Sequence, residues 1–308
     1  MRILLFFKNL RRGLASLVLA VLCCSWMFAG CQTSEQSENR GIIRIGLVAD
    51  PQGADKDTYG KRTYRDSLRK MKDFVDAMLA WDPDFIVVLG DLIDVYSEDY
   101  LKAMDSEYAR IPAARRHYVL GNHDRPHELF IGGLSAFIAP NYSFELKGVT
   151  FIILDGNWDK GGKSHNPPWN DSYVPDAELS WLEETLKNCA GKAVVFMHQR
   201  LDGDPERQRN EGVLQNAPAV RTVLEQSQKV IAVFQGHDHR CGAKNIINGI
   251  PYYTIWAMVE DSYPKTSYAY AYINVSTGTV SLYGKGNQRS YANEKPPSDV
   301  PVGTATQP

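Results

Sequence analysis

Short apolar segments recur along this chain, and an acidic, amide or imidazole side chain follows each of them. Amphipathic segments with apolar residues at the helical period, such as 64–79, lie between these runs. The alternation of strands and helices predicts an α/β domain. The apolar runs, short and continuous like strands buried on both faces, are residues 42–48, 85–89, 117–120, 193–197 and 230–234.

The polar side chains obey one positional rule, because each stands directly after a predicted strand. In α/β sheets, ligands bind at the carboxyl ends of the strands, so these side chains are expected to meet. Any one of them has a plainer explanation, such as a helix cap, a turn or a structural histidine, and the inference rests on the set. The set is Asp50, Asp91, Asn122, His198, His237 and His239.

Carboxylate, amide oxygen and imidazole together indicate a site for Mn, Fe or Zn ions. Asp91 is placed to bridge two ions roughly 3.5–4 Å apart, the spacing of two-metal hydrolases. A water between such ions loses a proton near neutral pH and attacks phosphorus in line. The sequence therefore predicts a two-metal hydrolase of phosphoric esters in which a metal-bridging hydroxide is the nucleophile.

These motifs, in this order, resemble the calcineurin-like metallophosphoesterase family: Asp50, Gly90-Asp91-x-x-Asp94, Gly121-Asn122-His123-Asp124, His198 and Gly236-His237-x-His239. The resemblance implies a four-layer α/β/β/α sandwich of two mixed sheets. It implies that Asp50 and His239 hold the first ion, that Asp91 bridges, and that Asn122, His198 and His237 hold the second. It also implies that His123 contacts phosphate and protonates the leaving oxygen, that Asp124 orients His123, and that Asp94 fixes its loop.

One departure from the family pattern concerns Gln52, which stands in Asp50-Pro51-Gln52 where Asp-x-His is usual. Gln52 is expected either to bind the first ion through its amide oxygen or to hold a metal-bound water. Both give the first site a lower affinity and harder ligands, which shifts its preference towards Mn or Mg. The variant resembles the manganese-dependent ADP-ribose/CDP-alcohol diphosphatase group. Three hypotheses follow: a phosphomonoesterase or phosphodiesterase, a nucleotide-diphosphate pyrophosphatase, and a surface-anchored binding protein with a degraded metal site.

The N-terminal residues have the composition of an export signal. A basic start precedes an apolar stretch at 14–28, and Phe28-Ala-Gly-Cys31 resembles a bacterial lipobox. We expect a signal peptide at 1–30, lipidation at Cys31, a polar tether at 31–40 and anchoring in the outer membrane. The metallophosphoesterase domain is predicted at 41–290, with a disordered tail at 291–308.

Several further residues and properties bear on partners. A net charge of −2 indicates no nucleic-acid partner, whereas a small phosphorylated substrate is expected. Arg200 is a candidate phosphate contact, with a solvated surface arginine as the alternative. Asn157-Trp158 and Pro168-Trp169 lie in a loop after Leu154 that is a candidate aromatic platform for a base or sugar, with plain loop packing as the alternative. Pairing of Cys189 with Cys241 and the oligomeric state are left open.

Overall fold

The computed structural model describes residues 41–300 apart from 126, 136–138, 164, 166, 209–211 and 296. The predicted signal peptide, the lipidation site Cys31 and the polar tether therefore lie outside the described residues. Within the described part of the chain, no helix is both long and apolar enough to cross a membrane.

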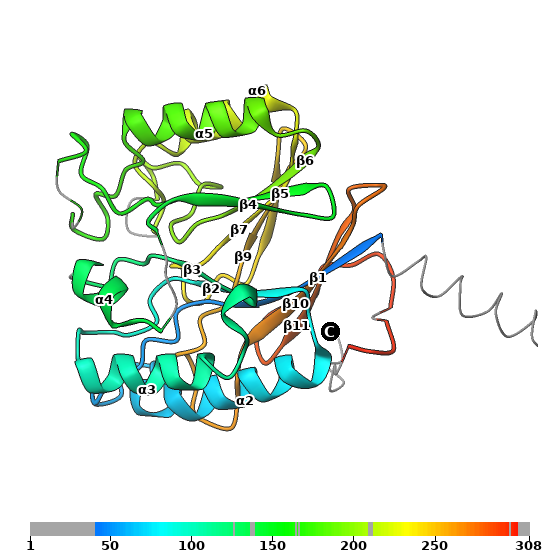
Figure 1. Cartoon of the computed structure of the whole chain (residues 1–308). Coiled ribbons are helices and arrows are strands. Elements are labelled where there is room, and N and C mark those ends of the chain that lie inside the picture. The colour runs from blue at the N-terminus through cyan, green and yellow to red at the C-terminus, as the bar shows by residue number, and fades with distance from the viewer. Residues whose placement is uncertain are drawn as a thin grey trace, which may run out of the picture. The chain divides into compact units, whose positions relative to one another are not determined.

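One sheet has the strand order β11-β10-β1-β2-β3, in which β1, β2 and β3 run parallel and β10 and β11 antiparallel. Every residue of β2 is buried, as expected of β-branched and apolar residues in a central strand. Helices α2 (Ser67–Trp81) and α3 (Glu98–Tyr108) cover the sheet's outer face (Figure 1). The strands are β1 (Ile42–Val48), β2 (Phe85–Leu89), β3 (Arg116–Val119), β10 (Tyr268–Asn274) and β11 (Val280–Lys285).

The other sheet has the order β4-β5-β6-β7-β9-β8, with β5, β6, β7 and β9 parallel and both edge strands antiparallel. Helices α5 (Asp176–Asn188) and α6 (Ala217–Ser227) cover its outer face (Figure 1). The strands are β4 (Tyr142–Leu146), β5 (Val149–Ile153), β6 (Lys192–Phe196), β7 (Val230–Gln235), β8 (Lys244–Ile247) and β9 (Ile250–Thr254). Shorter elements are η1 (Tyr64–Asp66), η2 (Ala113–Arg115) and α4 (His127–Gly133).

The inner faces of the two sheets pack against each other and form the main apolar core. Phe85 of β2 meets Phe151 of β5 edge to face at 4.8 Å between ring centroids, and Phe196 stacks on Phe234 at 5.5 Å. Such aromatic pairs add about 0.5–1.5 kcal/mol beyond the burial of their area. The four layers confirm the predicted α/β/β/α sandwich of two mixed sheets.

Two features of the fold differ from the sequence expectations. Helix α3 was not predicted, although Ser97 caps its N-terminus by accepting from the Tyr100 backbone N–H at 3.4 Å. Part of the segment expected to be disordered packs on the first sheet: Tyr291 pairs with Leu282, and Tyr272 Oη donates to Asp299 Oδ1 at 3.1 Å. Both cysteines of the domain, Cys189 and Cys241, are free thiols.

Candidate metal centre

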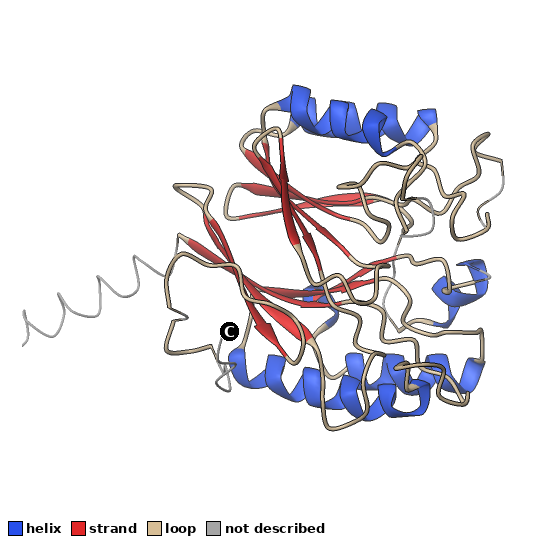
Figure 2. Ribbon diagram, turned by 180° about the vertical axis from the view of Figure 1, so that it is seen from behind, coloured by secondary structure: helices blue, strands red, loops and turns tan. Residues whose placement is uncertain are grey.

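The predicted ligands come from both sheets and meet where the carboxyl ends of their parallel strands adjoin. Figure 2 shows the loops after these strands gathered on one side of the two sheets. The first sheet contributes Asp50 after β1, Asp91 after β2 and Asn122 after β3. The second sheet contributes His198 after β6, and His237 and His239 after β7.

The backbone at these strand ends is strained. Asp50, Gln52, Asp91 and His237 have positive φ angles of 48°, 46°, 54° and 67°. Non-glycine residues adopt this left-handed region rarely, and they keep it where the surrounding structure holds them. These four residues therefore adopt unfavourable backbone conformations that direct their side chains into the site.

Glycines let the strand ends approach one another closely. A Cβ atom at Gly90 would collide with the His198 ring, and a Cβ atom at Gly121 would collide with the Asp91 carboxylate. Gly90 also has a φ of 87°, which side-chain-bearing residues seldom adopt. The glycines before Asp91 and Asn122 thus reflect contact between one ligand loop and the next.

One candidate ion site is formed by Asp91, His198 and His237, whose ligand atoms lie within 4.8 Å of one another. His198 Nε2 lies 3.3 Å from Asp91 Oδ2 and 3.0 Å from His237 Nδ1. The Asn122 side-chain oxygen lies 3.1 Å from the same His198 nitrogen. His198 Nδ1 donates to the Leu89 carbonyl at 2.7 Å, which fixes the ring so that Nε2 faces the other ligands.

The second candidate site is formed by Asp50, Asp91 and His239, again within 4.8 Å. His239 Nε2 lies 3.5 Å from Asp50 Oδ1. The Gln52 side-chain nitrogen lies 3.3 Å from Asp91 Oδ2, so Gln52 reaches the place where its motif predicted it. Asp91 belongs to both groups, which is the geometry that a bridging carboxylate requires.

The residues present fit divalent cations. Asp50 Oδ1, Gln52 Oε1 and His237 Nε2 are buried and have no hydrogen-bond partner among the described residues. Buried polar atoms are normally satisfied, and atoms that lack a partner at one place indicate a missing ion or water. Burial raises the pKa of Asp50, and burial lowers the pKa of His237, helped by the charge on His198.

His198 carries the positive charge of the metal-free site. Burial alone would lower its pKa, but Asp91 and Asp50 outweigh burial and raise the pKa to about 10. Burial also opposes ionisation of Asp91, yet His198 and His123 hold its pKa below the ordinary value. Positive charge beside Asp91 thus favours its ionised form, and a divalent ion would provide the same compensation.

His123 lies at the edge of the site, with its side chain 31% exposed. Its Nδ1 lies 2.7 Å from the Asp94 carbonyl oxygen and 3.5 Å from an Asp94 carboxylate oxygen. The expectation that Asp124 orients His123 is wrong, because Asp94 contacts the His123 ring and Asp124 binds backbone groups instead. Asp124 is buried with both carboxylate oxygens bound to the backbone N–H groups of Asp91, Leu92 and Gly121.

This correction has a simple physical cause. A carboxylate between two strand-end loops accepts hydrogen bonds from backbone N–H groups that have no strand partner. Asp124 therefore stabilises the conformation of the loop that carries Asp91. Burial, with the charge of Asp91, raises the pKa of Asp124 to about 8. Asp94, expected to fix its own loop, is the residue that contacts the His123 ring.

Glu260 is a residue of the site that the sequence did not reveal. Its carboxylate oxygen lies 3.2 Å from His239 Nδ1, on the far side of the ring from Asp50. The side chain is nearly fully buried, and Arg62 Nε lies 3.5 Å from it. Carboxylates behind ligating histidines fix the tautomer and the ring orientation. Glu260 stands in an irregular loop after β9, where no motif marked it.

A polar network behind the site joins the two sheets. Asn157 Nδ2 donates to the Leu120 carbonyl at 2.8 Å, and Gln199 Nε2 donates to Asn157 Oδ1 at 2.7 Å. Asp155 Oδ1 accepts from the Asn157 backbone and side chain. Because Asp155 follows β5, the strand-end rule could have found this network. It supports the loops of Asn122 and His198 from behind.

Arg200 does not lie open to a substrate. Its side chain is 6% exposed, and it donates to Asp202 Oδ1 at 2.9 Å and to Asp238 Oδ2 at 2.7 Å. Asp238 stands between His237 and His239, so Arg200 ties the β6 loop to the turn that carries two ligands. This position accounts for Arg200 without the substrate contact expected of it.

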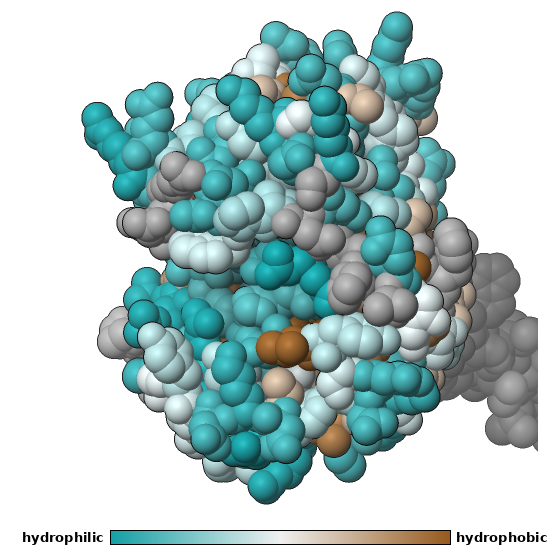
Figure 3. Space-filling view, turned by 90° about the vertical axis from the view of Figure 1, so that its left-hand side faces the viewer, coloured by the Kyte–Doolittle hydropathy of each residue, from teal (hydrophilic) through white to brown (hydrophobic). Residues whose placement is uncertain are grey.

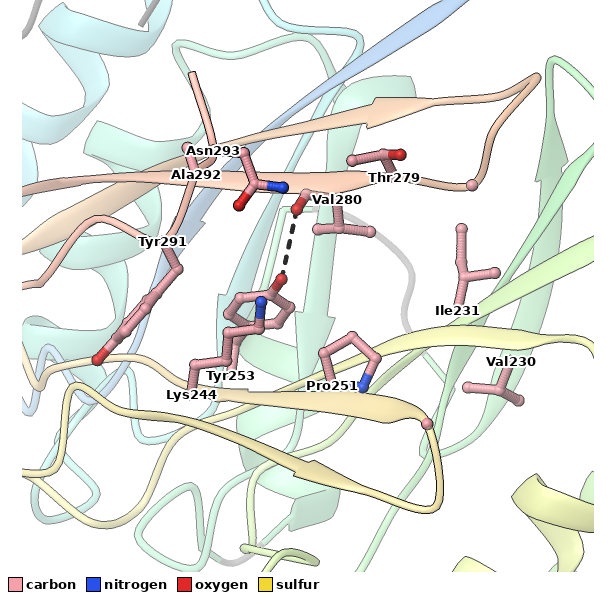
Figure 4. Close-up of a pocket in the computed structure, with 12 residues that line it drawn as sticks. Val230, Ile231, Lys244, Pro251, Tyr253, Thr279, Val280, Tyr291, Ala292 and Asn293 are labelled. Atoms are coloured by element: carbon pink, nitrogen blue, oxygen red, sulfur yellow. Dashed lines mark hydrogen bonds between the residues drawn. The ribbon is translucent and has the colours of Figure 1, made fainter. Parts of the chain in front are cut away.

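The side of the domain that carries these loops is hollowed across its middle, and hydrophilic residues gather in the hollow (Figure 3). A separate pocket lies at the amino end of β7, remote from the ligands at its carboxyl end. Lys244, Tyr253, Val280 and Tyr291 are among its lining residues, and Tyr253 Oη donates to the Val280 carbonyl at 3.4 Å (Figure 4). No predicted site residue lies in this pocket.

The arrangement supports hydrolysis of a phosphate ester. Two divalent ions held by the Asp91, His198, His237 group and the Asp50, Asp91, His239 group would supply Lewis acidity and an activated water. Asp50, Asp91 and Asn122 hold their oxygens, and the three histidines their nitrogens, at one edge of the two sheets where all but the partly buried His237 are buried. His123 Nδ1 is engaged by the Asp94 carbonyl, which leaves Nε2 as the ring nitrogen that could exchange a proton with a bound ligand.

Curated proteins that resemble this chain have a shared name. The manganese-dependent ADP-ribose/CDP-alcohol diphosphatase of Xenopus tropicalis is 24% identical over 315 residues, which is 79% of this chain and 91% of that protein. The protein of the same name from Oryza sativa subsp. japonica is 30% identical over 112 residues, 36% of this chain and 34% of that one.

Solved structures share the fold. A dimetal phosphatase from Danio rerio has a TM-score of 0.65 at 21% identity, covering 81% of this chain and 98% of its own. The protein TT1561 of Thermus thermophilus has a TM-score of 0.53 at 11% identity, covering 79% of this chain and 98% of its own. The family model described as calcineurin-like phosphoesterase matches residues 43–241. The chain therefore belongs to the calcineurin-like phosphoesterase family and is a hydrolase that acts on phosphoester bonds.

Proposed function

We propose that this protein is a manganese-dependent hydrolase of the diphosphate linkage in nucleoside-diphosphate compounds of the ADP-ribose and CDP-alcohol type. The observation that carries the proposal is Gln52, which lies beside Asp91 at the position where the family pattern has histidine. The same Asp-x-Gln variant resembles the group to which the Xenopus relative belongs by name, and that relative matches along most of both chains.

The chemistry of Gln52 supports Mn over softer metals at the first site. With Gln52 present, the first ion is surrounded by Asp50, Asp91, His239 and an amide or a water held by the amide. This set has one nitrogen and otherwise oxygen ligands, which harder cations prefer. The second ion, with His198 and His237, keeps a richer nitrogen set.

The roles of the chain's own residues follow from their positions. Asp91 would hold both ions, and the buried ligands would orient a bound phosphate between them. His123 is the exposed member of the site, so we assign to it the proton transfer to the phosphate that leaves. A diphosphate substrate suits an exposed general acid, because its leaving group is itself a bulky, charged nucleotide or sugar phosphate.

A matrix of metals and substrates tests the proposal. Metal-free protein is supplied with Mn, Fe or Zn and assayed on ADP-ribose, a CDP-alcohol, p-nitrophenyl phosphate and bis-p-nitrophenyl phosphate. We expect the highest kcat/KM on a nucleoside-diphosphate compound with Mn. Faster turnover of the p-nitrophenyl esters would favour the mono- or diesterase hypothesis. Inertness on all four substrates with every metal would favour the non-enzymatic binding protein.

We further propose that the protein is exported and carries a lipid at Cys31, in the outer membrane of a bacterium. The support is the basic, apolar and small-residue order that ends in Phe28-Ala-Gly-Cys31. Radiolabelled palmitate is expected to label the full chain and to be lost in Cys31→Ser. Labelling that persists in this variant would refute the assignment.

A further inference from the structure

Trp169 is a large aromatic side chain that stays 43% exposed next to the metal centre. Its ring centroid lies 5.9 Å from that of His237, and the two planes are tilted by 54°. The tilt shows that the two rings are not stacked face to face, so stacking on His237 does not use the indole face. Exposure of so large an apolar surface costs free energy that burial would recover, so its place beside a ligand calls for a binding role.

The backbone around Trp169 is held in place although the side chain is exposed. The Trp169 carbonyl accepts from Ser172 Oγ at 3.3 Å, and the Pro168 carbonyl accepts from the Asp171 N–H at 2.8 Å. Gln215 donates to the Asn170 carbonyl at 2.8 Å through its side chain. A fixed loop that presents an exposed indole is preorganised for stacking, because little conformational entropy is lost on binding.

The other tryptophan of the same loop is engaged within the protein. Trp158 stacks on His165 with 4.1 Å between ring centroids and 24° between ring planes, and its backbone forms an isolated antiparallel β-bridge with Tyr173. Both tryptophans were candidates for an aromatic platform in the sequence. The structure distinguishes them, since Trp158 has a stacking partner and Trp169 offers its surface at the metal centre.

We propose that Trp169 is the stacking platform for the base of the nucleoside-diphosphate substrate; this inference rests on the proposed function. A substrate whose phosphates lie at Asp91, His198 and His237 continues away from the ions as ribose and base. Trp169 stands beside His237, at the rim where that continuation emerges. An indole face stacks on adenine and cytosine alike, which suits compounds of both the ADP-ribose and the CDP-alcohol type.

Binding measurements with uncleavable ligands test the platform without relying on turnover. The α,β-methylene analogue of ADP-ribose carries a base, and methylenediphosphonate carries only the bridged phosphorus pair. Dissociation constants for both are measured by calorimetry on the full, Mn-loaded protein, on Trp169→Ala and on Trp169→Phe. Thermal unfolding of each variant checks that it is folded.

We expect Trp169→Ala to weaken the nucleotide analogue by roughly 5- to 150-fold, the range of base–aromatic stacking, and to leave methylenediphosphonate unchanged. Trp169→Phe keeps an aromatic face and should restore most of the affinity. Equal weakening of both ligands, or none, would overturn the platform. So would a wild-type protein that binds the analogue no more tightly than methylenediphosphonate. Hydrolysis of ADP-ribose by the wild type is scored separately, so the proposed function can stand while the platform falls.

Discussion

Glu260 offers the sharpest test of how the first ion site is built. Replacing it by alanine removes the carboxylate that faces His239 Nδ1 at 3.2 Å and leaves that ring nitrogen buried without its acceptor. Replacing it by glutamine keeps an oxygen of the same size at the same place. Both variants remove the negative charge of Glu260, but only the glutamine keeps a hydrogen-bond acceptor and the volume of the side chain.

The size of the effect follows from burial. A buried donor left without a partner costs about 1–3 kcal/mol, which corresponds to roughly a 5- to 150-fold change in an equilibrium constant. Loss of a carboxylate behind a ligating histidine costs about 10–100-fold in metal affinity, in agreement with this range. We expect Glu260→Ala to weaken the first ion by that amount and Glu260→Gln to weaken it less. The second ion, held by His198 and His237, should keep its affinity.

Titration of metal-free protein with Mn, followed by calorimetry, resolves the two sites. Glu178 supplies a matched control, because it is a buried carboxylate that accepts from the Asp155 backbone N–H at 2.8 Å, away from the ligands. Burial, with the charge of Asp155, raises the pKa of Glu178 to about 8. Glu178→Gln therefore replaces a mostly protonated acid by its amide and should leave both Mn affinities intact. If Glu260→Ala binds two ions as tightly as the wild type, the support assigned to Glu260 is refuted.

Four further predictions concern single residues. Asp91→Ala should abolish loading of both ions and the activity, as measured by metal content after dialysis; retention of either ion would reject the bridge. His123→Ala should bind metal normally and lose roughly 10²–10⁴-fold in kcat, whereas a loss of metal would show a structural role. Gln52→His should tighten the first ion in a Mn titration, and an unchanged affinity would place Gln52 away from it. Burial lowers the pKa of His117 to about 4, so its unfolded state binds the extra proton between about pH 6.5 and 4. The free energy of unfolding should fall by up to about 3 kcal/mol as pH drops through that window, and His117→Phe should flatten this part of a denaturant-midpoint curve.

Much of the fold was predictable because its strands are buried on both faces. Apolar runs such as β2 and β7 have few polar positions, so their residues identify them without any partner. The ligands were predictable for a related reason, since parallel strands place the residues after them at one edge. The position of Asp50, Asp91 and His198 directly after predicted strands was therefore enough to predict that they lie close together.

The missed residues lie where sequence neighbours do not determine spatial neighbours. Glu260 meets His239 across 21 residues, in a loop fixed by tertiary contacts. Lys70 of α2 holds that loop by donating to the Met258 and Val259 carbonyls at 2.9 and 3.3 Å. No local pattern reveals that a lysine on one helix shapes a distant loop. The roles of Asp94 and Asp124 were exchanged for the same reason, because both stand at strand ends and only their contacts tell them apart.

The division of the ligands between two sheets has a consequence for how the chain matures. Asp50 and the backbone N–H of His237 are joined at 3.1 Å across 187 residues of sequence. Contacts between residues so far apart in sequence form late in folding, because closing the intervening chain costs entropy before the contact stabilises the structure. A nascent chain that has produced only β1, β2 and β3 of the first sheet holds the three oxygen ligands Asp50, Asp91 and Asn122 and no imidazole of the centre. Binding of both ions therefore requires the second sheet to have docked on the first. We expect ion uptake to be a late step of folding.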